Sequence, residues 1–105
     1  DLVFDCRFLP NPHWVDDLRP LSGLDDPIQE YVLNRDLTTA FLDHLTAMLD
    51  DLIPAFDGEG KSYLTIAFGC TGGRHRSVAV AEAVGRILSE RGWQSRVSHR
   101  DINRP

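Results

Sequence analysis

The chain has 105 residues and a hydrophobic content of 42%, which fits one domain with a single modest core. Eleven basic residues against sixteen acidic ones give a net charge of -5, and this acidity argues against broad electrostatic adhesion to nucleic acid or to an anionic membrane. No apolar run approaches the roughly 20 residues that a bilayer span requires, and we expect a cytoplasmic protein that does not associate with membranes.

A buried strand is predicted at residues 2–4, which are apolar and partly β-branched, and polar residues 5–7 follow it. Pro10 and Pro12 then exclude regular helix or strand and hold a stiff, extended loop. His13 lies on this loop.

Two helices are predicted next. Asp26 followed by Pro27 is typical of a helix start, with a capping carboxylate followed by a proline at the first helical position. Apolar residues at three- and four-residue spacing predict a second, amphipathic helix over residues 36–53, and we expect Pro54 to end it.

The rest of the chain predicts strand, loop, helix and strand. The second strand is expected at residues 63–68 and a third helix at residues 78–88, with Gly92 closing that helix in the left-handed conformation. Residues 94–98 predict a third strand.

This order of elements predicts an α/β fold, namely a small three-layer domain with a mainly parallel sheet flanked by helices. Ligands of such sheets collect beyond the carboxyl ends of the strands. We therefore expect residues 5–7, the loop of His13, the loop over residues 70–77 and residues 99–101 to gather at one edge.

The loop over residues 69–77 is the strongest candidate for a binding site. It joins a predicted strand to a predicted helix, so the first amides of the helix are unpaired and carry partial positive charge. Gly72 and Gly73 allow a tight turn and close approach of an oxyanion, and Arg76 adds a planar, bidentate donor. This pattern predicts a phosphate site.

The same loop fits the pattern Cys-x-x-Gly-x-x-Arg-Ser and resembles the signature loop of cysteine-dependent phosphatases. In that alternative the Cys70 thiolate attacks phosphorus, Arg76 stabilises it, and Asp5 or Asp101 serves as the general acid. Gly69 stands where those enzymes usually carry histidine.

A metal site is a further alternative, but the candidate ligands lie on separate loops without the short paired spacings that zinc sites favour. We expect no metal, and we expect the two cysteines to be free thiols. The candidate metal ligands are Cys6, His13, Cys70, His75 and His99.

Four segments, taken together, resemble the C-terminal domain of the RapZ/YvcJ family. They read Phe-Asp-Cys-Arg-Phe-Leu-Pro-Asn-Pro-His-Trp at residues 4–14, Leu-Arg-Pro-Leu-Ser-Gly-Leu-Asp at 18–25, Gly-Cys-Thr-Gly-Gly-Arg-His-Arg-Ser-Val at 69–78 and His-Arg-Asp at 99–101. The resemblance covers residues 1–105 as a single domain.

The resemblance implies a regulatory rather than a catalytic domain, which senses glucosamine 6-phosphate or a similar phosphorylated amino sugar. It implies an N-terminal P-loop domain with ATPase or GTPase activity in the parent protein, whose Gly-x-x-x-x-Gly-Lys-Ser/Thr element is absent here. ATP or GTP is therefore expected in that domain, and no cofactor is expected in this one. Self-association into a homo-oligomer is also implied.

Carried onto matching positions, the resemblance implies two groups of ligand contacts. The sugar would face Asp5, His13 and Cys70. The phosphate would be held by Thr71, Gly72, Gly73, His75, Arg76 and Ser77.

In enterobacterial members of that family the domain also binds small RNA as an adapter for an RNase. Those members carry a lysine- and arginine-rich end, whereas this chain reads Asp-Ile-Asn-Arg-Pro at residues 101–105. This difference and the net acidity argue against RNA binding, because affinity for RNA grows with the number of cations on its phosphates. The candidates for any RNA contact are Arg74, Arg96, Arg100 and Arg104.

Overall fold

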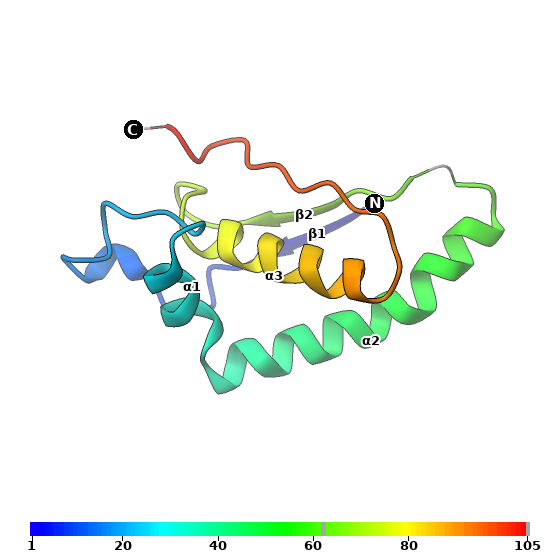
Figure 1. The fold of residues 1–105 in the computed structure, drawn as a ribbon, viewed down its shortest axis with the longest axis horizontal. Coiled ribbons are helices and arrows are strands. Elements are labelled where there is room, and N and C mark those ends of the chain that lie inside the picture. Colours follow the sequence, from blue (N-terminus) through cyan, green and yellow to red (C-terminus); the bar gives the residue numbers. More distant parts are fainter. Residues whose placement is uncertain (62, 105) are drawn as a thin grey trace.

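The computed structural model describes residues 1–61 and 63–104, which form two strands, three α-helices and one short 3-10 helix (Figure 1). The elements in chain order are β1 (Leu2–Asp5), η1 (Pro12–Trp14), α1 (Asp26–Leu33), α2 (Asp36–Gly58), β2 (Ile66–Gly69) and α3 (Arg76–Glu90). None of the described helices is long and apolar enough to cross a membrane.

Strands β1 and β2 pair in parallel, with Leu2 opposite Ile66 and Asp5 opposite Gly69. Because both strands end at the same edge, the polar residues after β1 lie beside the glycine loop after β2. The α/β class with a parallel sheet is confirmed.

The core lies on one face of this sheet. Phe4 stacks on Phe68 with ring centroids 5.7 Å apart and meets the edge of Phe41 from α2 at 5.9 Å. All three helices contribute to the same core, whose fully buried members include Ile28, Val32, Leu49, Ala79 and Val80.

The opposite face of the sheet is open among the described residues, because Val3 is 81% exposed and Ala67 is exposed as well. The described helices therefore cover one side of the sheet, whereas a three-layer arrangement with helices on both sides was expected.

The prediction of a third strand at residues 94–98 is wrong. Residues 93–98 form no strand and run back along α3 instead (Figure 1). Close packing occurs at Gly85, where an added β-carbon would lie 2.6 Å from Cγ2 of Val97. The missing side chain lets this segment pack on the helix rather than on the sheet edge.

Several boundaries also differ from the prediction, and helix α3 runs from Arg76 to Glu90 where residues 78–88 were expected. Helix α2 continues through Pro54 to Gly58, because a proline removes only its own N–H and the next turn is closed by a bond from Glu59 N to Ala55 O of 3.2 Å. Strand β2 begins at Ile66 rather than at residue 63. Helix α1 begins within one residue of the predicted start, but Asp26 is its first helical residue and the N-cap is Asp25, which makes no side-chain capping bond. The left-handed Gly92 after α3, at φ 87°, is confirmed.

Candidate anion-binding site

The loop between β2 and α3 is a tight turn that only glycine accommodates easily. Gly72 and Gly73 have φ values of 83° and 69°, which lie in the left-handed region. Helix α3 begins directly after the loop at Arg76, and His75 makes no side-chain capping bond to it.

The amides of residues 71–76 are the main feature of the site. Within the described part of the chain, none of them donates to a protein acceptor. The first engaged amide is that of Ser77, which donates to Sγ of Cys70 at 3.4 Å. Unpaired amides at the start of a 15-residue helix form a region of positive potential, which is suited to an oxyanion.

A pocket of 310 Å³ opens beside this loop at the carboxyl ends of both strands. Its polar lining combines the sequence-predicted Asp5, Cys70 and Thr71 with Arg7, and the full lining is Val3, Phe4, Asp5, Arg7, Gly69, Cys70 and Thr71. The parallel sheet thus brings together residues that are more than sixty positions apart.

Asp5 and Arg7 form a bidentate ion pair in the pocket. Nη2 of Arg7 lies 2.6 Å from Oδ2 of Asp5, and Nε donates to both carboxylate oxygens at 3.0 and 2.9 Å. These bonds from Arg7 lower the pKa of Asp5 to about 2. Asp5 is therefore a carboxylate at all ordinary pH values and can accept hydrogen bonds from a ligand.

Arg76 links the two halves of the site. Its side chain is buried at 5% exposure, and Nη1 donates to the carbonyl oxygens of Arg7 at 2.8 Å and of Leu9 at 3.2 Å. Nε and Nη2 have no protein acceptor among the described residues. Because Arg7 lines the pocket, the bond to its carbonyl oxygen places the guanidinium of Arg76 near the pocket.

The two cysteines differ in environment. Cys70 is half-buried, and its Sγ lies 3.2 Å from Oγ of Ser77, so thiol and hydroxyl form one polar pair at the start of α3. Cys6 is fully buried, and burial raises the pKa of its thiol to about 12. Cys6 is therefore an unreactive core residue, and both cysteines are free thiols as expected.

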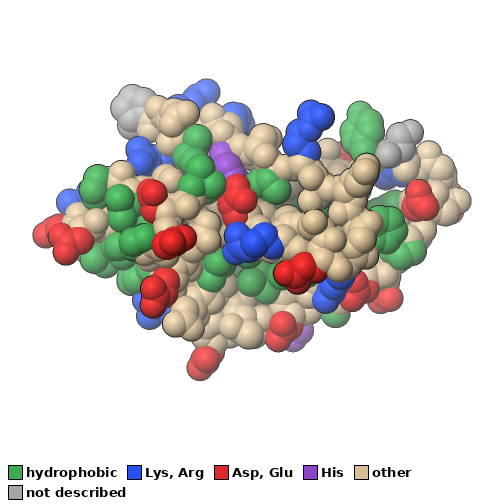
Figure 2. All heavy atoms as spheres, in the orientation of Figure 1, with side chains coloured by type: hydrophobic (Ala, Val, Ile, Leu, Met, Phe, Trp, Pro, Cys, Tyr) green, Lys and Arg blue, Asp and Glu red, His purple; other side chains and the backbone are tan. Residues whose placement is uncertain are grey.

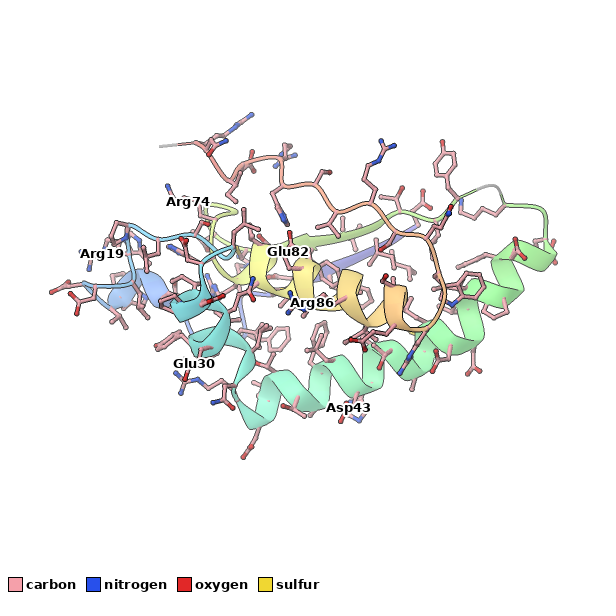
Figure 3. All side chains as sticks on the ribbon, in the orientation of Figure 1. Arg19, Glu30, Asp43, Arg74, Glu82 and Arg86 are labelled. Carbon is pink, nitrogen blue, oxygen red and sulfur yellow. The ribbon has the colours of Figure 1, made fainter. Side chains whose placement is uncertain are left out.

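His75 and Arg74 face another part of the chain. Nε2 of His75 lies 2.6 Å from the carbonyl oxygen of Leu21, and Nη2 of Arg74 donates to the carbonyl oxygen of Pro20 at 3.0 Å. The imidazole therefore anchors residues 19–21, contrary to the expected phosphate contact, and only the backbone of His75 remains at the loop. Arg19 and Arg74 are both labelled on the left side of the molecule in Figure 3.

His13 is not brought to the site. Its side chain is exposed, its amide donates to Oδ1 of Asn11 at 3.0 Å, and it is not part of the pocket lining. The expected sugar contact of His13 therefore has no support from this geometry.

The four arginines considered for RNA do not form a basic patch. Arg100 and Arg104 both pair with Asp101, at 2.9 and 3.0 Å, Arg74 is bound to carbonyl groups, and Arg96 is exposed. On the face drawn in Figure 2, basic and acidic side chains are interspersed.

The geometry disfavours the phosphatase alternative, because neither candidate acid is suited to donate a proton. Arg7 holds the pKa of Asp5 low, and a hydrogen bond from Arg100 lowers the pKa of Asp101. No three His, Cys, Asp or Glu side chains in the described residues are grouped to hold a metal ion.

Arg7 and Asp101 were expected at this sheet edge, but neither was predicted as a ligand contact. Arg7 lines the pocket, and its position at the end of a predicted strand was the available signal. Asp101 lies against Gly73, where an added β-carbon would be 2.9 Å from Cβ of Asp101. The sequence placed Asp101 near this loop through a third strand, whereas in the structure a segment without strand structure brings it there.

Comparisons with known proteins agree with the sequence resemblance. A family model described as the RapZ C-terminal domain matches residues 1–103. A protein of Jannaschia sp. (strain CCS1) named "Nucleotide-binding protein" is 56% identical over 104 residues, covering 99% of this chain and 33% of the relative. A protein of Trichlorobacter lovleyi with the same name is 58% identical over 103 residues, covering 98% and 36%.

The chain thus spans about a third of the length of the curated relatives it matches. The family match covers nearly all of these residues, including both strands and the glycine loop. The chain belongs to the RapZ C-terminal domain family.

Proposed function

We propose that this chain is a regulatory domain that binds a phosphorylated amino sugar, such as glucosamine 6-phosphate, without chemical turnover. The observation that carries the proposal is the set of amides at residues 71–76, which have no acceptor among the described residues and lie at the start of α3.

The phosphate would sit on these amides. Backbone donors at a helix start favour a dianion, and glycines let its oxygens approach the backbone. Nε and Nη2 of Arg76 are further donors at this end of α3. The guanidinium of Arg7, whose side chain is 67% exposed, adds a second positive charge.

The sugar would lie in the pocket beside Asp5. A carboxylate whose pKa is about 2 accepts hydrogen bonds from hydroxyl groups and attracts a protonated amine. The volume of 310 Å³ is at the lower end of the range of about 300–1,000 Å³ that small-molecule sites span. The pocket and the adjoining loop therefore offer hydrogen-bond donors for a phosphate and a carboxylate for a protonated amine, as an amino-sugar phosphate requires.

Nucleotide binding and ATPase or GTPase activity are proposed for the parent protein, outside this chain. The sequence Gly58-Glu59-Gly60-Lys61 superficially resembles part of a phosphate loop, but Gly58 ends α2 instead of opening a helix, and Lys61 pairs with Asp1 at 3.2 Å. Self-association is likewise proposed from the family alone.

An RNA-adapter role has less support, since Asp101 pairs with two of the four candidate arginines and the chain carries a net charge of -5. Binding of a structured small RNA, measured as a function of salt concentration, tests this role. Binding of the RNA at low ionic strength, with an affinity that falls steeply as the salt concentration rises, would support this role.

Isothermal titration calorimetry tests the sugar-phosphate proposal with glucosamine 6-phosphate, glucose 6-phosphate and glucosamine. We expect tightest binding for the first, weaker binding for the second because it lacks the amine, and weakest binding for the third. Asp5→Asn should reduce the difference between the first two ligands, while Asp51→Asn on the exposed side of α2 should not. Equal affinity for glucosamine and its 6-phosphate would refute the proposal.

A further inference from the structure

The C-terminal segment, residues 93–104, returns along α3 and ends beside the glycine loop (Figure 1). Among its contacts with α3 and the loop, Val97 packs at Gly85, His99 bonds to Glu82, and Asp101 lies against Gly73. The segment therefore connects the far end of α3 with the candidate anion site.

The bond between His99 and Glu82 anchors the C-terminal segment to α3. Nε2 of His99 lies 2.8 Å from Oε1 of Glu82, and the two side chains are only 11% and 28% exposed. Glu82 projects from α3 toward the segment in Figure 3. This bond fixes the residues just before Asp101 in place.

Asp101 is the contact that bears on the site. An added β-carbon at Gly73 would lie 3.3 Å from Oδ2 of Asp101, so the carboxylate lies against the loop backbone. Its side chain is only 20% exposed. A negative charge at this position opposes the binding of an anion to the loop amides.

Two arginines share this carboxylate. Nη2 of Arg100 lies 2.9 Å from Oδ2 and Nε of Arg104 lies 3.0 Å from Oδ1. Both arginine side chains are otherwise open, at 85% and 72% exposure. Two flexible cations are therefore held next to an anion site by a single carboxylate.

We propose that Asp101 is an internal competitor that tunes the affinity of the glycine loop for phosphate and transfers Arg100 and Arg104 to a bound phosphate group. This inference rests on the proposed function of the loop. Arginine bonds to a phosphate dianion are charge-assisted and bidentate, so a dianion exchanges with the carboxylate more readily than a monoanion does. The C-terminal segment thereby favours phosphate over singly charged ligands.

The first test is calorimetric titration of the chain with inorganic phosphate, in the wild type and in Asp101→Asn. Removing the competing charge should tighten phosphate binding by about tenfold. Asp51→Asn, which removes the same charge from the exposed side of α2, should change it by less than about twofold because of screening.

The second test follows the arginines directly by NMR. The Nε–H signals of Arg100 and Arg104 should shift when phosphate is added to the wild type. The signal of Arg91, which pairs with Asp50 at the other end of α3, serves as the internal reference and should not shift. If Asp101→Asn disturbs folding, the double variant Arg100→Gln/Arg104→Gln replaces it and should bind phosphate more weakly than the wild type.

Equal phosphate affinity in wild type and variant, with unmoved arginine signals, would overturn the role of the segment and leave the loop site standing. No phosphate binding by either protein would overturn the loop site as well.

Discussion

Nη1 of Arg76 donates to the carbonyl oxygen of Arg7 at 2.8 Å, although the two residues are 69 positions apart. This bond joins the first turn of α3 to the residues that follow β1. The anion site and the Asp5 pocket are therefore held as one unit by a buried guanidinium, and several predictions depend on this link.

Arg76→Lys should weaken both stability and phosphate binding. A lysine keeps the charge, but its single ammonium cannot both replace Nη1 on the two carbonyl groups and supply the donors that Nε and Nη2 offer to a phosphate. The loss of hydrogen bonds from a charged donor costs about 1.5–3 kcal/mol. Chemical denaturation and calorimetry measure the two effects. Arg86→Lys, on the exposed side of α3, is the matched control and should change neither. Unchanged phosphate affinity in Arg76→Lys would argue against the guanidinium as part of the site.

Gly23→Ala should destabilise the fold. Gly23 is buried against the start of α3, and a β-carbon there would lie 2.6 Å from both Ala79 N and His75 O, which are backbone atoms that cannot rotate away. Such overpacking costs about 1–3 kcal/mol in the free energy of unfolding. Gly58→Ala, at the end of α2, meets nothing within 4 Å and should be neutral or slightly stabilising. Equal stability of the two variants would contradict the packing described here.

The Asp5–Arg7 pair predicts a specific pH dependence. The folded pKa of Asp5, about 2, is below its ordinary value of 3.8, so the pair contributes stability above pH 3.8 and loses it as the pH falls toward 2. A carbon-13 NMR titration of the Asp5 carboxyl should give a midpoint near 2, and Arg7→Gln should return it toward 3.8. An unshifted midpoint in the wild type would show that the pair does not form in solution.

No hydrolysis of a generic aryl phosphate is expected from this chain. Hydrogen bonds from Arg7 and Arg100 lower the pKa of Asp5 and of Asp101, so both side chains favour the ionised form and are poor proton donors to a leaving oxygen. A colorimetric assay with the wild type and Cys70→Ser tests this expectation. Turnover that disappears in the variant would establish the cysteine-dependent alternative instead.

The strand, loop and helix around Gly72 could be predicted from the sequence because each has a local signal: an apolar run, two adjacent glycines and a helical period. The parallel pairing followed from the order of the elements, and it correctly placed Asp5 near Cys70.

The destinations of several side chains could not be predicted. His75 bonds to Leu21 O and Arg76 to Arg7 O, and these carbonyl groups belong to irregular loops whose path has no local sequence signal. Residues 94–98 were expected to form a strand, yet Val97 packs at Gly85 on α3, and such a tertiary contact has no local sequence signal.

The most direct test of the central claim is a phosphate titration of the chain followed by amide NMR. If the amides of residues 71–76 hold the oxyanion, their signals should shift together and saturate, led by Gly72 and Gly73, while those of Gly58 and Gly60 stay in place. Saturable binding that leaves the amides of residues 71–76 unmoved, or no binding at all, would contradict the account.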